Sequence, residues 1–89
     1  MQPKIIAVDD DRDFLDLFAQ KLAGCGYPNV QVEENPFAAA SRFDAGEHFD
    51  LAMIDMTMPE MEGIELVQRI KAASPRTECI MVTAVNEAR

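Results

Sequence analysis

The sequence predicts an α/β fold built around a parallel sheet. Short apolar runs alternate with segments of helical periodicity from one end of the chain to the other, which is typical of parallel strands joined by crossover helices. Two of the runs, residues 5–8 and 51–54, are continuously apolar, as expected for strands that are covered on both faces. A chain of 89 residues has room for one domain only.

A first strand is expected over about residues 4–8, and an amphipathic helix follows it. Asp10 or Asp11 can cap the amino end of this helix, and Gly24 and Gly26 end it. The apolar residues that recur at helical spacing along its expected inner face are Phe14, Leu15, Phe18 and Leu22.

A second strand over about residues 30–33 is expected to be half exposed, because valines alternate with polar residues along it. Asn35 followed by Pro36 predicts the start of a second helix, with proline in its first turn. The expected inner face of this helix consists of Phe37, Ala40 and Phe43.

The third strand is expected over residues 49–54, in the centre of the sheet, since it is apolar on both faces. A loop through Pro59 and Gly63 leads to a third helix, which Ser74-Pro75 ends. The last strand covers residues 78–82. The expected inner face of the third helix consists of Leu66, Val67 and Ile70.

The chain is acidic: 16 acidic residues against eight basic ones give a formal net charge of −8, which repels nucleic-acid phosphates and attracts cations. We therefore expect no direct nucleic-acid binding by this segment.

No run reaches the roughly 18 apolar residues of a membrane span, and residues 1–4 do not begin an export signal, so the expected location is the cytoplasm. There, Cys25 and Cys79 are expected to be reduced thiols.

Aspartates follow both of the continuously apolar strands. Asp9 and Asp10 come directly after the first, and Asp55 comes directly after the third. Because ligand sites in open α/β sheets lie outside the carboxyl ends of neighbouring strands, we expect these acids to converge on one pocket. Mg²⁺ binds through one or two carboxylates together with water and substrate oxygens. The acids therefore predict a magnesium site for phosphoryl chemistry, and the hydroxyl of Thr83 can hydrogen-bond the phosphoryl group.

The same acids also have a simpler interpretation. The aspartates between Asp9 and Asp13 can cap a helix and place negative charge near its positive amino end. Asp55 by itself is an ordinary residue for a turn that follows a strand. Only the combination of the acids with the hydroxyl of Thr83 favours metal and phosphoryl chemistry.

This combination resembles the receiver domains of bacterial two-component response regulators. The matching elements are Asp9-Asp10 after the first strand, Asp55 with Met58-Pro59 and Gly63 after the third, and Thr83-Ala84 after the fourth. Their order and strand-end positions are jointly specific, whereas any one of them alone would be weak. The resemblance implies that residues 1–89 form a receiver domain with a flavodoxin-like, doubly wound sheet in the strand order 2-1-3-4.

The resemblance further implies Mg²⁺-dependent transfer of a phosphoryl group from a phosphohistidine of a sensor histidine kinase to Asp55. In the family, the residue that matches Asp10 binds the metal directly and the one that matches Asp9 assists. The backbone carbonyl that matches Thr57 is also a metal ligand, and the hydroxyl that matches Thr83 contacts the phosphoryl group. Such a domain switches a partner or an output domain and catalyses part of its own phosphorylation and dephosphorylation, but it is not a classical enzyme.

Receivers also carry elements that these 89 residues lack. The family continues through a fourth helix, a fifth strand and a fifth helix, and the fifth strand ends in a lysine that pairs with the phosphoryl group. Lys4, Lys21 and Lys71 are expected to lie far from the pocket. We therefore expect a domain that is incomplete at its C-terminal end. The open edge at residues 79–82 favours a strand-exchanged or edge-paired oligomer, or a fragment of a longer regulator.

Two alternative functions fit part of the pattern. In the first, the chain is a structural or dimerising receiver fragment that no longer switches, because the lysine-bearing strand is absent. In the second, the chain is a phosphohydrolase of the haloacid dehalogenase type, which also uses an aspartate after an apolar strand as its nucleophile. Those enzymes carry a second aspartate two residues later as general acid, and Thr57 in that position argues against them.

Overall fold

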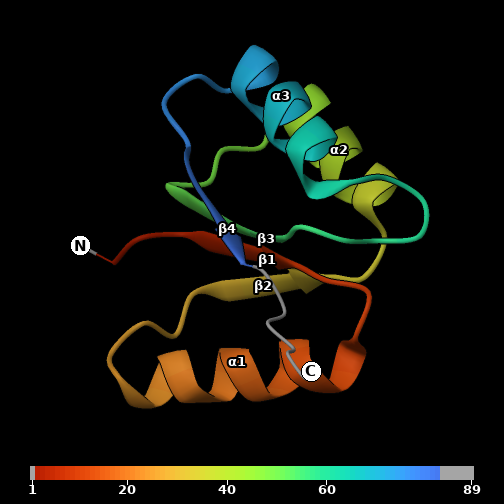
Figure 1. The fold of residues 1–89 in the computed structure, drawn as a ribbon. Coiled ribbons are helices and arrows are strands. Elements are labelled where there is room, and N and C mark those ends of the chain that lie inside the picture. The colour runs from red at the N-terminus through yellow and green to blue at the C-terminus, as the bar shows by residue number, and fades with distance from the viewer. Residues whose placement is uncertain (1, 83–89) are drawn as a thin grey trace.

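The computed structural model describes residues 2–82, in which four strands alternate with three helices (Figure 1). In chain order they are β1 (Ile5–Val8), α1 (Arg12–Gly24), β2 (Val30–Glu33), α2 (Pro36–Asp44), β3 (Leu51–Asp55), α3 (Gly63–Ala73) and β4 (Glu78–Val82). No helix in this part of the chain is long and apolar enough to cross a membrane.

The strands form one parallel sheet in the order β2-β1-β3-β4, which confirms the predicted fold class and strand order. The helix α1 covers one face of the sheet, and α2 and α3 cover the other (Figure 1). At the carboxyl end of the sheet, Val8 of β1 is in register with Glu33 of β2 and with Ile54 of β3, and Asp55 is in register with Val82 of β4. The loops that follow β1 and β3 therefore leave the sheet side by side.

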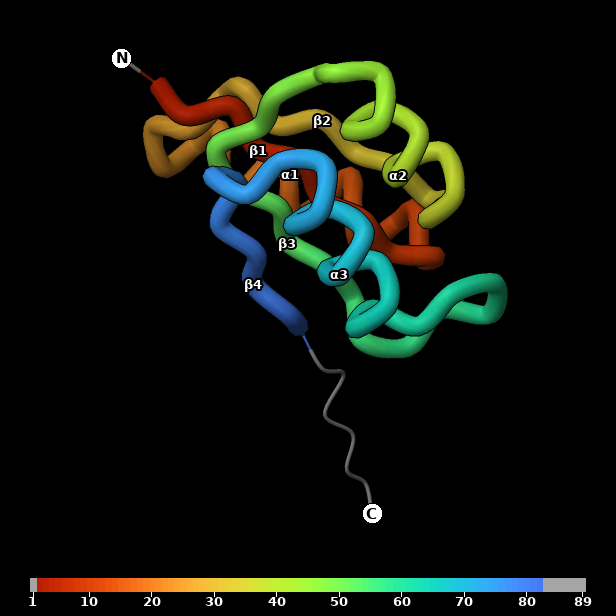
Figure 2. Tube along the Cα trace, turned by 90° about the horizontal axis from the view of Figure 1, so that it is seen from above, coloured from red at the N-terminus to blue at the C-terminus, as the bar shows by residue number. Residues whose placement is uncertain are grey.

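The core has two layers, one on each side of the sheet. On the α1 side, Leu15 packs against Ala7 and Met53. The larger layer lies beneath α2 and α3, which pack against each other over the sheet (Figure 2). Its buried residues are Ile6, Val8, Ala39, Ala40, Phe43, Phe49, Ala52, Ile54, Met58, Met61, Leu66 and Ile70.

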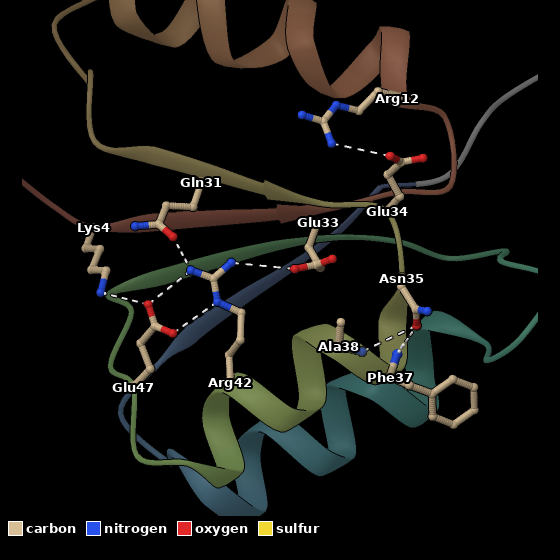
Figure 3. A network of polar contacts seen from close by, with 10 residues as sticks. All are labelled: Lys4, Arg12, Gln31, Glu33, Glu34, Asn35, Phe37, Ala38, Arg42 and Glu47. Atoms are coloured by element: carbon tan, nitrogen blue, oxygen red, sulfur yellow. Dashed lines mark hydrogen bonds and ion pairs between the residues drawn. The ribbon is translucent and has the colours of Figure 1, made fainter.

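The expected inner face of α2 was wrong at Phe37, whose side chain is 49% exposed. The Asn35 side chain caps the helix by accepting hydrogen bonds from the N–H groups of Phe37 and Ala38. This cap sets the helical phase so that Pro36 faces inward, together with the residues three, four and seven positions later. Phe37 is therefore turned outward, as Figure 3 shows.

The two edges of the sheet differ in chemical character. Along the β2 edge, Arg42 of α2 bonds to Gln31 and forms ion pairs with Glu33 (3.6 Å) and Glu47 (3.0 Å) (Figure 3). The Arg42 guanidinium also lies 5.3 Å from the centre of the Phe49 ring. Charged and polar side chains of this kind discourage the pairing of a sheet edge with another chain.

The β4 edge carries apolar side chains instead. Ile80 is 50% exposed, and within the described residues β4 pairs with β3 alone. Between β4 and α1 lies an apolar groove of about 450 Å³, lined mainly by Phe18, Leu22, Tyr27, Met53 and Ile80. The β4 edge and this groove together leave apolar surface open on the α1 side of the sheet.

Thr77, in the turn between α3 and β4, provides a test of the packing. It is fully buried, and its hydroxyl donates to the backbone carbonyl of Phe49 at 2.8 Å. Its single proton is used there, so the Ser74 hydroxyl, 2.7 Å away, donates to Thr77. Thr77→Val keeps the side-chain shape but leaves the buried carbonyl of Phe49 and the partly buried hydroxyl of Ser74 without this partner. We expect the free energy of unfolding in urea to fall by about 1–3 kcal/mol.

The matched control for that substitution is Ser41→Ala on the exposed surface of α2. Its effect is expected to stay within about 0.5 kcal/mol, because exposed side chains away from special features contribute little. Equal effects of the two substitutions would contradict the role assigned to the Thr77 hydroxyl.

Candidate functional site

Two short turns place the predicted acids. After β1, the Asp9 carboxylate accepts the N–H of Asp11 at 2.9 Å, which turns the chain toward α1. The Asp11 side chain then caps α1 by accepting the N–H of Phe14 at 3.2 Å. Asp55 is the last residue of β3. Asp9 and Asp55 are 9% and 8% exposed, whereas Asp10 is on the surface.

The turns bring three of the acids together. One carboxylate oxygen from each of Asp9, Asp10 and Asp55 can be chosen so that all three lie within 4.8 Å of one another. They open into a pocket of about 360 Å³ at the carboxyl end of the sheet. The pocket is lined by Asp9, Asp10, Asp11, Phe14, Asp55, Thr57 and Val82, so no lysine or arginine contributes to the part of its wall that the structure describes.

Burial and mutual repulsion both act on these acids. Burial raises the pKa of Asp9 to about 6, and the nearby charges of Asp55 and Asp10 act in the same direction, against the hydrogen bond from Asp11. Burial also raises the pKa of Asp55, with a further contribution from the charge of Asp10, although the nearby backbone N–H groups of Thr57 and Met56 oppose the rise. The folded chain therefore holds these carboxylates where their ionised forms are disfavoured.

The donor set fits a hard divalent cation. Mg²⁺ prefers oxygen ligands, is bound by one or two carboxylates, and keeps several positions for water or substrate oxygens. The carboxylate oxygens at this open pocket supply such ligands, and two positive charges would offset both the burial and the repulsion that raise the pKa of Asp9. Thr57 lines the same pocket. Thr83 lies outside the described residues, but Val82, which precedes it, is part of the pocket wall.

Sequence reasoning missed the apolar part of the pocket wall. Phe14 was expected on the inner face of α1, but it is 37% exposed and lines the pocket beside the acids. Its ring stacks on Phe18, with the ring centres 5.9 Å apart. The position of Phe14, three residues after the capping Asp11, is the signal that could have shown this. The first turn of a helix that begins at the carboxyl end of a strand lies next to the strand-end pocket.

Comparison with known proteins gives a consistent family. The family profile described as response regulator receiver domain matches residues 5–89. The chemotaxis protein CheY of Listeria monocytogenes is 29% identical over 84 residues, which cover 94% of this chain and 70% of that protein. A cyclic di-GMP phosphodiesterase of Thermotoga maritima is 30% identical over 83 residues, but the match covers only 22% of its length. The chain thus corresponds to a small part of some relatives.

Solved structures are similar over nearly the whole chain. A CheY-like response regulator receiver domain protein from Methanospirillum hungatei superposes with a TM-score of 0.86 at 32% identity, covering 98% of this chain and 68% of that one. The response regulator TrrA from Thermotoga maritima, solved in complex with Mg²⁺-BeF, superposes with a TM-score of 0.84 at 29% identity. That match covers 96% of this chain and 71% of that protein.

The raised pKa of Asp9 leads to a prediction about stability. The folded state retains the Asp9 proton up to a pH of about 6, whereas an unfolded aspartate loses it near 3.9. Folding is therefore penalised progressively as the pH rises from about 4 to above 6. Asp9→Asn removes the penalty and can still accept the N–H of Asp11. In EDTA at pH 7.5 we expect it to be more stable than the parent by about 1–3 kcal/mol in urea, with the difference vanishing near pH 4.

Asp50→Asn is the matched control, because it removes the same charge elsewhere. The hydrogen bond from the backbone N–H of Lys4 lowers the pKa of Asp50, so that its ionised form stabilises the fold. This substitution is expected not to stabilise the chain at pH 7.5. If both substitutions stabilised it equally, relief of the overall charge of −8 would explain the result instead.

Proposed function

Because this chain belongs to the response regulator receiver domain family, whose members act in phosphorelay signalling, we propose that it accepts a phosphoryl group on Asp55 in an Mg²⁺-dependent reaction. The observation that supports this proposal most directly is the meeting of Asp9, Asp10 and Asp55 at the carboxyl ends of the two central strands. The family match also argues against the haloacid dehalogenase alternative.

In the proposed reaction, an oxygen of the Asp55 carboxylate attacks the phosphorus of a phosphohistidine on a sensor histidine kinase. The bond between phosphorus and the imidazole nitrogen breaks, and its electron pair stays on the histidine. Asp55 suits this role because it is the last residue of a central strand and lines the pocket beside Asp9 and Asp10. The product is an acyl phosphate on Asp55.

We assign the remaining acids to the metal. Asp10 and Asp55 would bind Mg²⁺ directly, Asp9 would bind it directly or through water, and the backbone carbonyl of Thr57 would complete the protein ligands. When bound, the ion would neutralise charge between the carboxylates and the incoming phosphoryl group. The hydroxyl of Thr83 would hydrogen-bond a phosphoryl oxygen.

The partner proposed for this site is a sensor histidine kinase, and the phosphorylated state would switch a partner or an output domain. The match covers about a fifth of the length of some relatives. The domain would promote its own phosphorylation and dephosphorylation without being a classical enzyme. Direct binding of nucleic acid by this segment is disfavoured by its net charge of −8.

Incubation with Mg²⁺ and a small acyl phosphate tests the proposal. We expect the intact mass to rise by one phosphoryl group and the adduct to hydrolyse on standing. Asp55→Asn and excess EDTA should both prevent the increase, whereas Asp50→Asn should not. If the parent chain gains no phosphoryl group but binds Mg²⁺ and beryllofluoride, the result favours the alternative, in which the chain is a structural or dimerising receiver fragment that does not switch.

We also propose that copies of this chain associate through β4. The edge of β4 is apolar where that of β2 is charged, and it borders the apolar groove against α1. Edge pairing would extend the sheet across two copies and cover Ile80. A longer chain could cover the same edge with a strand of its own, and size measurements on this chain distinguish the two arrangements.

Ile80→Lys is the variant for that measurement. We expect sedimentation to show the parent as a dimer or larger species and Ile80→Lys as a monomer, because a buried lysine at the contact would be unpaired. Ile64→Lys on α3 is the control, since Ile64 is exposed to the same degree, 51% against 50%, and should leave the oligomer intact. A monomeric parent at the highest concentration tested would eliminate edge pairing.

A further inference from the structure

The loop that follows Asp55 returns to the end of β3 and touches it. Gly63, the first residue of α3, is buried, and its N–H donates to the carbonyl of Met56 at 2.9 Å. A Cβ atom on Gly63 would lie 2.4 Å from the carbonyl oxygen of Asp55 and 2.8 Å from the Cα of Met56. Both are backbone atoms, which cannot rotate away as the end of a side chain can. Only glycine allows α3 to begin this close to the candidate phosphoryl acceptor.

The other glycines show that this is a specific contact. A Cβ on Gly24, Gly26 or Gly46 would meet no atom within 4 Å. Gly26 and Gly46 have backbone φ values of 97° and 92°, so they are needed for their turns. Gly63 instead is needed for close approach, and the backbone atoms it approaches belong to Asp55, whose carboxylate lines the pocket, and to Met56 after it.

The end of β3 is held from a second side by β4. The N–H of Met56 donates to the carbonyl of Val82 at 3.0 Å. Further along the loop, Met58 and Met61 are 4% and 3% exposed and anchor it in the core beneath α2 and α3. The backbone of Asp55 and Met56 therefore lies between the start of α3 and the end of β4.

We propose that Gly63 is a positioning residue for the acid site. The contact of its Cα with the Asp55 and Met56 backbone sets how far β3 extends, and thereby where the Asp55 carboxylate lies relative to those of Asp9 and Asp10. This inference rests on the proposed function only in taking Asp55 to be a metal ligand and phosphoryl acceptor. An added methyl group at position 63 would displace α3 or the strand end, and the three carboxylates would no longer meet in the same geometry.

The test compares Gly63→Ala with Gly24→Ala. Both variants add one methyl group to a helix, where alanine is intrinsically preferred to glycine, but only the first adds it against backbone atoms. We expect calorimetry to show Mg²⁺ binding at least about tenfold weaker in Gly63→Ala, the usual size of an effect on the supports of a metal ligand. Gly24→Ala should bind Mg²⁺ as the parent does.

Amide hydrogen exchange provides a second measurement, the protection of individual backbone amides, which involves no metal. In Gly63→Ala we expect the amide of Met56 to lose protection by a larger factor than the amides in the middle of β1 and β3. A substitution that only lowered global stability would reduce protection at all slowly exchanging amides together. It would also leave the Mg²⁺ affinity of the folded molecules unchanged at a temperature where nearly all of them are folded.

Unchanged Mg²⁺ affinity together with uniform exchange would overturn the proposal. If Gly63→Ala alone does not fold, the double variant that carries both Gly24→Ala and Gly63→Ala is studied in a stabilising osmolyte. Its reference is then the single variant Gly24→Ala under the same conditions. Selective loss of Met56 protection supports the positioning role even if the parent accepts no phosphoryl group. Failure of the phosphorylation proposal and failure of this one are thus separate results.

Discussion

The crowding of the carboxylates of Asp9, Asp10 and Asp55, which combines burial with mutual repulsion, is the constraint on which the site depends. Their oxygens lie within 4.8 Å of one another, and the described wall of their pocket contains no basic side chain. Like charges at such distances and partial burial disfavour the ionised forms. The arrangement persists because the central strands that carry the acids are fixed by the core on both faces of the sheet. A cation that bound there would therefore gain more from these carboxylates than from the same acids in a flexible segment.

The support of the site comes from backbone as much as from side chains. Asp9 is held by the N–H of Asp11, and the strand end at Met56 is held by Val82 on one side and Gly63 on the other. Backbone contacts of this kind move little, because they belong to the sheet and to the start of a helix. They link the position of the Asp55 carboxylate to α3 and to β4, so that a shift of either element would also move this carboxylate.

The asymmetry of the sheet edges bears on how the domain meets other chains. The β2 edge is covered by the ion pairs around Arg42, and both Arg42 and Lys4 lie over the Phe49 ring. The β4 edge has no comparable cover among the described residues, and its last residue, Val82, lines both the acid pocket and the apolar groove. Whatever fills that groove will therefore lie next to the site.

The sequence by itself determined the fold class, the strand order through the family resemblance, and the meeting of the acids. The fold class and the meeting of the acids follow from local signals: continuous apolar runs mark the central strands, and aspartates directly after them must lie at the carboxyl edge of a parallel sheet. Tertiary structure decided what depends on helical phase and on close approach. The cap at Asn35 turned Phe37 outward, the start of α1 brought Phe14 to the pocket, and the packing of α3 against Asp55 made Gly63 necessary. A one-dimensional pattern records the period of an element, but its rotation and its distance from a neighbour are fixed only when the elements pack.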